Sequence, residues 1–126
     1  MKRPAMFALL AAPLGAAMLV AAGAPADIVR PDLPGRVVFE NQCAPCHGTG
    51  PGADGAPMLP GTAALAAKYD GSKPGALELR GDLPAPVLRL FVRRGVGAMP
   101  AFRKSEITDA QIDEVAAYLA ATAAAN

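Results

Sequence analysis

Cys43, Cys46 and His47 stand in the sequence C-A-P-C-H and comprise both cysteines and the only histidine of the 126-residue chain. C-x-x-C-H is the spacing of covalent haem c attachment. On one turn of helix, two cysteines three positions apart can each form a thioether with a haem vinyl group, and the next residue then faces the iron. We therefore predict one covalent haem c per chain, anchored by the two cysteines and ligated by the histidine.

The same residues allow three other arrangements. A disulfide between Cys43 and Cys46 would close a very small loop, add little stability and leave His47 idle. A thioredoxin-like redox pair belongs in a βαβ context, which the sequence lacks. A structural zinc site normally takes four ligands, so a carboxylate would have to complete this set. The spacing favours haem over all three.

A haem iron ligated by one histidine has a second axial position. With a single histidine in the chain, methionine is the expected ligand, and it raises the reduction potential. Beyond residue 26 the methionines are Met58 and Met99. The chain between His47 and Met58 is too short to pass easily around the edge of the haem to its other face. Met99 lies in a glycine-rich loop that is stiffened by Pro100. We predict Met99 as the ligand; the alternatives are Met58 and a five-coordinate iron.

Further residues are expected around the haem. The second ring nitrogen of His47 needs an acceptor that fixes its tautomer, and the carbonyl of Pro57 is the candidate, with Pro51 as the rival. The haem propionates need polar partners. Arg80 and Tyr69 are the candidates, with Arg80 favoured by its position in a loop.

The first 26 residues show the order of a secretory signal peptide. A basic start precedes an almost wholly apolar run over residues 7–22, and residues 24–26 supply small side chains for cleavage after Ala26. A transmembrane anchor is the alternative, but the run is too short and too rich in Ala, Pro and Gly for a stable span of about 20 apolar residues. We expect a cleaved signal at 1–26 and an exported, periplasmic domain at 27–126 that does not span the membrane.

Loss of the signal would also remove Lys2 and Arg3, two positive charges, and change the formal net charge from +1 to −1. The mature domain then has no basic field of the kind that nucleic-acid binding requires. It also has no Trp and few aromatic residues, while its many alanines add little buried area each. Something besides side chains is expected to fill the core.

The sequence pattern predicts helices and no sheet. A first helix is expected from Gly35 to about Ala44, a short one over 62–69 with Thr62 as its cap, and another from about Asp82, the expected N-cap, to a stop at Gly95. Residues 48–61 are rich in Gly and Pro and should form an irregular loop.

The last helix should begin after Thr108, which forms a capping box with Gln111. No stretch alternates with period two, so the fold class is all-α, with three main helices separated by long loops. Loops of this length are unusual in a small domain unless they wrap around something.

With these elements in place, the sequence resembles the class I c-type cytochromes over nearly all of residues 27–126. The shared features are an aromatic before C-x-x-C-H, a Gly/Pro loop, a helix that ends in R-x-G, an M-P loop and a final amphipathic helix. In that family the first and last helices cross where a glycine meets an aromatic. Gly35, Phe39 and Tyr118 match those positions.

A narrower similarity links Arg80-Gly-Asp-Leu-Pro84 and residues 91–104 to the small cytochrome subunits of flavin-dependent phenol hydroxylases, such as p-cresol methylhydroxylase and its eugenol and vanillyl-alcohol relatives. It implies an electron carrier rather than an enzyme. The donor would be a flavoprotein phenol or alcohol dehydrogenase, and the electrons would pass to a further acceptor and the respiratory chain. The other hypotheses are a haem protein with an open iron site, acting as a sensor or peroxidase-like enzyme, and a non-haem module that uses the cysteines.

Basic residues flank the loop that holds Met99. They are Arg89, Arg93, Arg94, Arg103 and Lys104. They could form a rim that steers an acidic partner. The alternative is an ordinary solvated helix end, in which cations complement the helix dipole.

Overall fold

A computed structural model describes residues 27–126; the predicted signal peptide at 1–26 lies outside the described residues. The helices are α1 (Pro34–Gln42), α2 (Ala44–His47), η1 (Ala53–Gly55), α3 (Pro60–Tyr69), η2 (Leu77–Leu79), α4 (Ala85–Arg94) and α5 (Asp109–Ala125), where η marks a 3₁₀ turn. Residues 27–126 contain no strand, only one isolated bridge between Val96 and Met99. The all-α prediction is confirmed.

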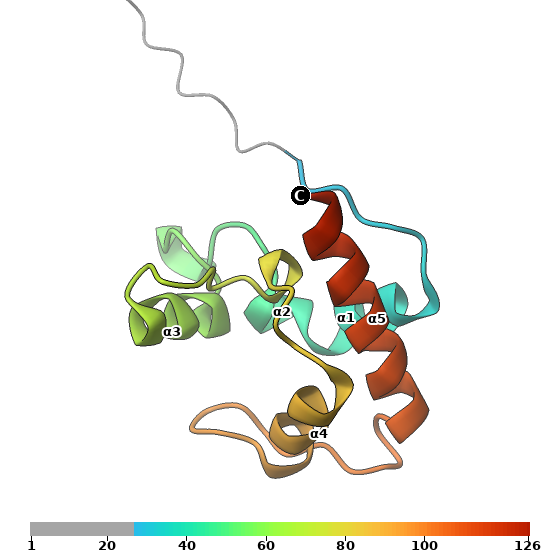
Figure 1. The fold of residues 1–126 in the computed structure, drawn as a ribbon. Coiled ribbons are helices and arrows are strands. Elements are labelled where there is room, and N and C mark those ends of the chain that lie inside the picture. The colour runs from blue at the N-terminus through green and yellow to red at the C-terminus, as the bar shows by residue number, and fades with distance from the viewer. Residues whose placement is uncertain (1–26) are drawn as a thin grey trace, which may run out of the picture.

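The first and last long helices, α1 and α5, cross and form the centre of the fold (Figure 1). At the crossing, a Cβ on Gly35 would lie 2.0 Å from the carbonyl oxygen of Glu114, so only glycine permits this approach. Phe39 and Tyr118 are fully buried beside it, with ring centroids 5.5 Å apart. The crossing expected from the class I resemblance is confirmed.

The helix predicted from Gly35 to Ala44 is interrupted at Cys43. α1 ends at Gln42, and α2 begins at Ala44. Pro45 explains the break, because it has no N–H to donate to the carbonyl of Asn41 and its ring would clash with that group. The last four residues of C-x-x-C-H therefore form a separate short helix, with Cys43 at its N-cap.

The start of α3 differs from the prediction. The helix begins at Pro60, whose missing N–H costs nothing at a first helical position, and Leu59 is the N-cap residue. Thr62, the predicted cap, lies inside the first turn. The predicted end is confirmed, since Asp70 adopts a left-handed conformation with φ of 45°.

The remaining helix ends are partly as expected. Asp82 does not cap α4; the N-cap position is held by Pro84, and the Asp82 carboxylate instead accepts hydrogen bonds from Arg80. Gly95 ends α4 with φ of 66°. The capping box of Thr108 and Gln111 is confirmed at the start of α5.

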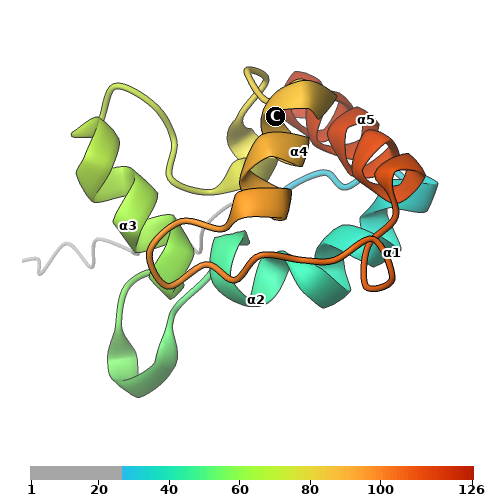
Figure 2. The same ribbon diagram turned by 90° about the horizontal axis from the view of Figure 1, so that it is seen from below.

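The helices differ in how they contact one another. α4 and η2 pack on α5, and α2 packs on α1 and α3, but none of the extensive helix contacts joins α3 to α4. Seen from below, α3 stands apart from the α1–α4–α5 body (Figure 2). The core residues are Phe39, Leu88, Val92, Ile107, Ile112, Val115, Ala116, Tyr118 and Leu119. None of them belongs to α3.

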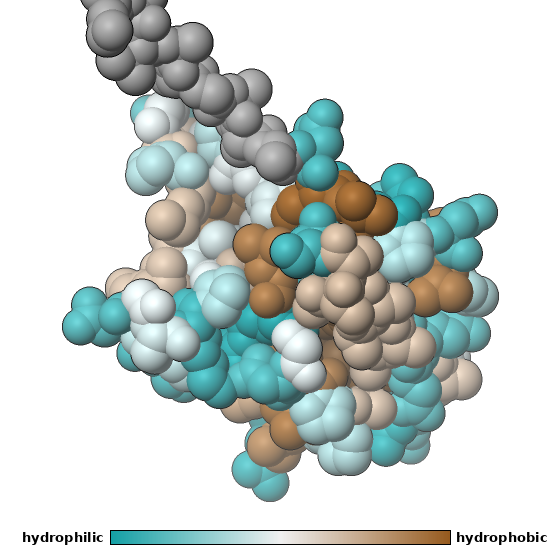
Figure 3. Space-filling view, turned by 45° about the horizontal axis from the view of Figure 1, so that its top comes forward, coloured by the Kyte–Doolittle hydropathy of each residue, from teal (hydrophilic) through white to brown (hydrophobic). Residues whose placement is uncertain are grey.

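Hydrophobic side chains also reach the surface among hydrophilic ones (Figure 3). The large exposed ones are Val29, Val37, Met58, Leu79, Leu90, Phe91 and Val96. None of the helices formed by residues 27–126 is both long and apolar enough to cross a membrane.

Candidate functional site

Both cysteines of C-x-x-C-H are free thiols in the structure, on or next to α2. Cys43 is half-buried and Cys46 is exposed. Burial raises the pKa of the Cys43 thiol to about 11. A redox-active C-x-x-C pair works through a thiol of lowered pKa, so this environment counts against the thioredoxin-like alternative.

The protein ligands for a zinc site are not assembled either. Within residues 27–126, no three His, Cys, Asp or Glu side chains are grouped so that they could hold a metal ion. C-x-x-C-H therefore lacks the fourth protein ligand that structural zinc requires. The arrangement suits a group that brings its own equatorial ligands, as haem does.

His47 is the last residue of α2 and is partly buried. Desolvation lowers the pKa of its imidazole and so favours the neutral form, which is the form that binds a metal. Its Nδ1 atom is buried and makes no hydrogen bond. The expected bond to the carbonyl of Pro57 or Pro51 is therefore not formed, although both prolines, with Thr62, line one pocket of about 320 Å³.

Met99 sits in a tight turn that its own backbone holds. The N–H of Met99 donates to the carbonyl of Val96 at 2.9 Å, and the N–H of Val96 donates back at 3.1 Å. Gly95 and Gly97 have φ of 66° and 57°, and a Cβ on Gly95 would lie 2.5 Å from the carbonyl oxygen of Met99. The main chain is thus fixed, and the half-buried Met99 side chain packs at the edge of the core.

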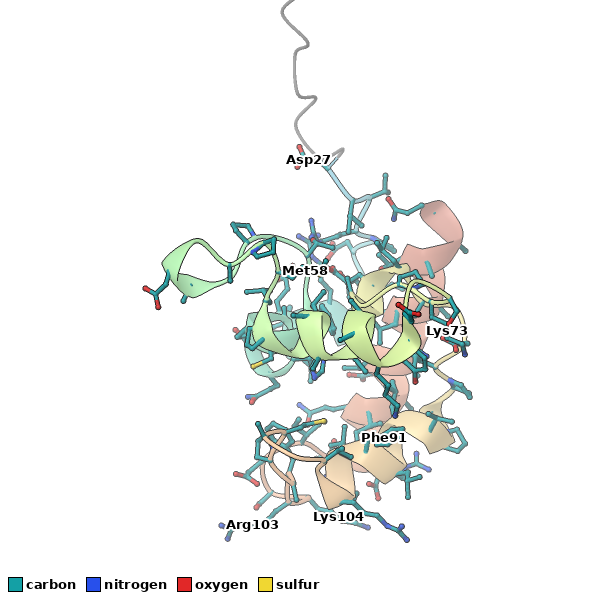
Figure 4. The ribbon with its side chains drawn as sticks, turned by 90° about the vertical axis from the view of Figure 1, so that its left-hand side faces the viewer. Asp27, Met58, Lys73, Phe91, Arg103 and Lys104 are labelled. Carbon is teal, nitrogen blue, oxygen red and sulfur yellow. The ribbon has the colours of Figure 1, made fainter. Side chains whose placement is uncertain are left out.

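The other candidate methionine, Met58, lies elsewhere. Met58 and Phe91 lie on opposite sides of α3, and Phe91 is on the side of α4 nearer to α3 (Figure 4). The Met58 side chain is 41 % exposed and lines the pocket beside Pro57. Its position gives no support to Met58 as the axial ligand.

Arg93 ties the segment after Met99 to the body of the protein. Its guanidinium donates to the carbonyls of Phe102 at 3.0 Å and Ile107 at 2.7 Å, and to the carboxylate of Asp109 at 2.7 Å. Arg93, then Lys104, lowers the pKa of Asp109 to about 2. Arg93 is therefore a structural clamp and not a free docking charge.

Most of the predicted basic rim is paired in the same way. Arg89 contacts the carboxylates of Asp113 and Asp109, and Lys104 lies 2.9 Å from Asp109. Arg94 and Arg103 are exposed and form no ion pair with the described residues. The rim predicted from five basic residues is thus reduced to two unpaired cations.

Tyr69 and Arg80, the predicted propionate partners, are brought together. The Arg80 guanidinium lies 4.7 Å from the centroid of the Tyr69 ring, and the amines of Lys68 and Lys73 lie 5.6 Å from it. Arg80, the main cause, lowers the pKa of Tyr69. Arg80 also binds Asp82 through two nitrogens, at 2.8 and 2.9 Å, and Lys73 pairs with the same carboxylate, so two cations share Asp82 near this end of α3. That charge balance suits an added carboxylate.

A buried polar cluster around Glu78 is not among the features that the sequence predicts. This carboxylate is 2 % exposed and accepts from Tyr118 Oη at 2.8 Å and from Arg30 Nε at 2.8 Å. Arg30 also donates to Thr49 Oγ1 at 2.9 Å, just after C-x-x-C-H. Glu78 lies between two leucines in the sequence, and no local pattern indicates that it turns inward.

The free thiols of Cys43 and Cys46 and the partly buried imidazole of His47, whose lowered pKa favours its neutral form, fit covalent haem c. An all-α fold that carries C-x-x-C-H in this way is the arrangement of a c-type cytochrome domain. Residues 31–119 match the protein family described as cytochrome C oxidase, cbb3-type, subunit III, and the chain belongs to this family. It is a haem c electron-transfer domain of the class I type. No curated protein and no solved structure matches the chain.

Proposed function

We propose that this protein is a periplasmic one-electron carrier in which Cys43 and Cys46 anchor a single haem c and His47 and Met99 ligate its iron. Bound haem c supplies reversible one-electron chemistry. The protein fixes the two axial side chains, keeps water away from the ring and presents a surface to redox partners. With His47 and Met99 as its ligands, the iron would have no open position for a substrate.

The position of α3 carries this proposal. Residues 63–67 of this helix are all apolar, yet Thr62 is its only buried residue, and its extensive helix contact is with α2 alone. An isolated helix of this length is marginal in water, so α3 needs a packing partner. Leu79 and Phe91 are also 39 % and 40 % exposed, and burial of the surface that remains would contribute about 1 kcal/mol for each. A large apolar ring anchored on α2 would supply both contacts.

We propose Arg80 and Tyr69 as the residues nearest the haem propionates. Arg80 and Lys73 support this, because both lie beside the Tyr69 ring and share the single carboxylate of Asp82. We keep Pro57 as the proposed acceptor for Nδ1 of His47. Its support is that Pro57 lines one pocket with Thr62, whose hydroxyl contacts the carbonyls of Cys46 and Gly48 on either side of His47.

The proposed electron donor is a flavin-dependent phenol or alcohol dehydrogenase, and the acceptor a component of the respiratory chain. The similarity of residues 80–84 and 91–104 to cytochrome subunits of such enzymes supports the donor. Export at the predicted signal, residues 1–26, would place the protein in the periplasm. Purification from the source periplasm, followed by N-terminal sequencing and identification of bound proteins, tests both points. A cytoplasmic protein that retains residues 1–26 would contradict the export.

The ligation is tested on protein made with the cytochrome maturation machinery. A pyridine haemochrome assay should find one covalent haem per chain, and Cys43→Ala with Cys46→Ala should lose it. The oxidised protein should show a weak sulfur-to-iron absorption band at the near-infrared end of its visible spectrum. The reduced protein should not bind carbon monoxide readily. Rapid carbon monoxide binding would instead indicate an open iron site, and absence of covalent haem would leave only a non-haem module.

A further inference from the structure

The first turn of α3 is in direct contact with the His47 ring. A Cβ on Gly61 would lie 2.6 Å from Cε1 and 2.7 Å from Nδ1 of this ring, and 2.8 Å from the carbonyl oxygen of Cys46. Real Cβ atoms do not approach other atoms so closely, so the ring keeps its place only because residue 61 has no side chain. Gly61 therefore marks one wall of the space that the ring can occupy.

The next residue, Thr62, ties the same turn to the backbone of the C-x-x-C-H segment. Its hydroxyl donates to the carbonyl of Gly48 at 2.8 Å and lies 3.4 Å from the carbonyl of Cys46. The side chain is buried, with 6 % of the residue exposed. The hydroxyl therefore joins the residues that flank His47 on both sides to α3.

The first turn of α3 also has a close contact on the side away from His47, with Gly75. A Cβ on Gly75 would lie 2.4 Å from the carbonyl oxygen of Thr62 and 3.0 Å from Cβ of Ala66. The loop after α3 thus packs closely against the helix at the level of Thr62. The first turn cannot move away from His47 without disturbing this second contact.

We infer that Gly61 and Thr62 are positioning residues that set the orientation and depth of the His47 ring toward its ligand. The inference rests on the proposed ligation of haem iron by His47. Groups around a metal ligand orient it and tune the metal, so a change at these two positions should alter the iron centre itself and not only the stability of the fold.

The first test compares Gly61→Ala with Gly81→Ala in the holoprotein. A Cβ on Gly81 meets nothing within 4 Å, and this glycine has no positive φ, so Gly81→Ala is a matched control. We expect Gly61→Ala to shift the midpoint potential and the paramagnetically shifted NMR signals of the oxidised haem several-fold more than Gly81→Ala does. Equal, small shifts in the two variants would overturn the inference for Gly61.

A second test does not depend on whether Gly61→Ala folds. Thr62→Val removes the hydroxyl and keeps the shape, while Thr62→Ser keeps the hydroxyl. Thr122→Val is the control for loss of a buried hydroxyl elsewhere, since the Thr122 hydroxyl donates to the carbonyl of Tyr118 in α5. We expect the potential and the NMR signals to change in Thr62→Val, to return largely to wild type in Thr62→Ser, and to stay unchanged in Thr122→Val. Loss of stability in Thr62→Val without a change at the haem would overturn the inference.

The two proposals fail in different ways. If the wild-type holoprotein shows no low-spin haem with histidine ligation, the proposed function fails. If the wild type shows that centre and the Gly61 and Thr62 variants leave it unchanged, only the positioning role fails.

Discussion

The guanidinium of Arg93, at the end of α4, lies 2.7 Å from the carboxylate of Asp109, at the start of α5. Because Arg93 also donates to the carbonyls of Phe102 and Ile107, this ion pair closes the loop that carries Met99 against two helices. A basic residue that looks in sequence like part of a docking rim is thus needed for the shape of the proposed axial-ligand loop.

Arg93→Gln should therefore weaken that loop. Hydrogen bonds to a charged group contribute about 1.5–3 kcal/mol, so the free energy of unfolding should fall by about 2 kcal/mol or more. The sulfur-to-iron band should weaken as well, since the segment that follows Met99 would lose its attachment to α4 and α5. Arg94→Gln is the control, because Arg94 is exposed and unpaired among the described residues. Denaturant unfolding and the oxidised spectrum measure both effects, and equal behaviour of the two variants would contradict the clamp.

Met99→Ala should open the iron to external ligands. We expect a lower reduction potential, within the range of about 0.8 V that axial ligands span, together with loss of the sulfur band and binding of carbon monoxide. Met58→Ala should leave all three properties as in the wild type, since Met58 is exposed in another loop. A Met99→Ala protein that keeps its sulfur band would show that another group is the ligand.

Gly35→Ala should destabilise the crossing of α1 and α5. The added Cβ would lie 2.0 Å from the carbonyl oxygen of Glu114, so the helices must separate. Overpacking of this kind typically costs about 1–3 kcal/mol, and backbone atoms cannot yield as a side chain can. Thermal unfolding of the holoprotein measures the effect. Gly81→Ala should unfold at nearly the wild-type temperature, and an equally stable Gly35→Ala would mean that the helices tolerate a wider spacing.

Stability should fall at alkaline pH because of Tyr118. Burial, then its hydrogen bond to Glu78, raises the pKa of Tyr118 from its ordinary value of 10.0 to about 12. Between these values the unfolded chain loses the phenolic proton and the folded chain keeps it, so the free energy of unfolding decreases as pH rises. The shift corresponds to a loss of about 2–3 kcal/mol.

Guanidinium unfolding followed by circular dichroism from pH 8 to 12 checks this expectation. Tyr118→Phe should start from a lower stability at pH 8, because Glu78 loses a donor, and should then decline less steeply. Parallel curves for the wild type and Tyr118→Phe would mean that another group controls the alkaline transition.

Electron exchange with a small anionic oxidant such as ferricyanide should depend on Arg94 and Arg103. Each Arg→Gln change removes an uncompensated charge and should lower the rate a few-fold at low ionic strength, with the difference lost at high salt. The control removes a whole ion pair, Arg89→Gln with Asp113→Asn, and should change the rate little. A larger effect of the control would show that the paired cluster, and not Arg94 and Arg103, faces the oxidant.

Several features follow from local sequence alone. C-x-x-C-H, the capping box of Thr108 and Gln111, and the glycine turns around Met99 depend on residues a few positions apart, and their hydrogen bonds form within one turn of chain. The break at Cys43 was also encoded locally, by Pro45, although the predicted helix ran through it.

Only the tertiary structure decided which distant groups meet. Glu78 and Tyr118 are 40 positions apart and share a buried hydrogen bond, and Thr62 holds the backbone at Gly48 rather than capping its own helix. Arg93 and Asp109 are 16 positions apart and form an ion pair that joins two helices. The physical reason is that burial and charge pairing act through space. A polar residue forms a hydrogen bond or ion pair with the group that the packed helices place beside it. The spacing of residues in the sequence does not predict which group that is.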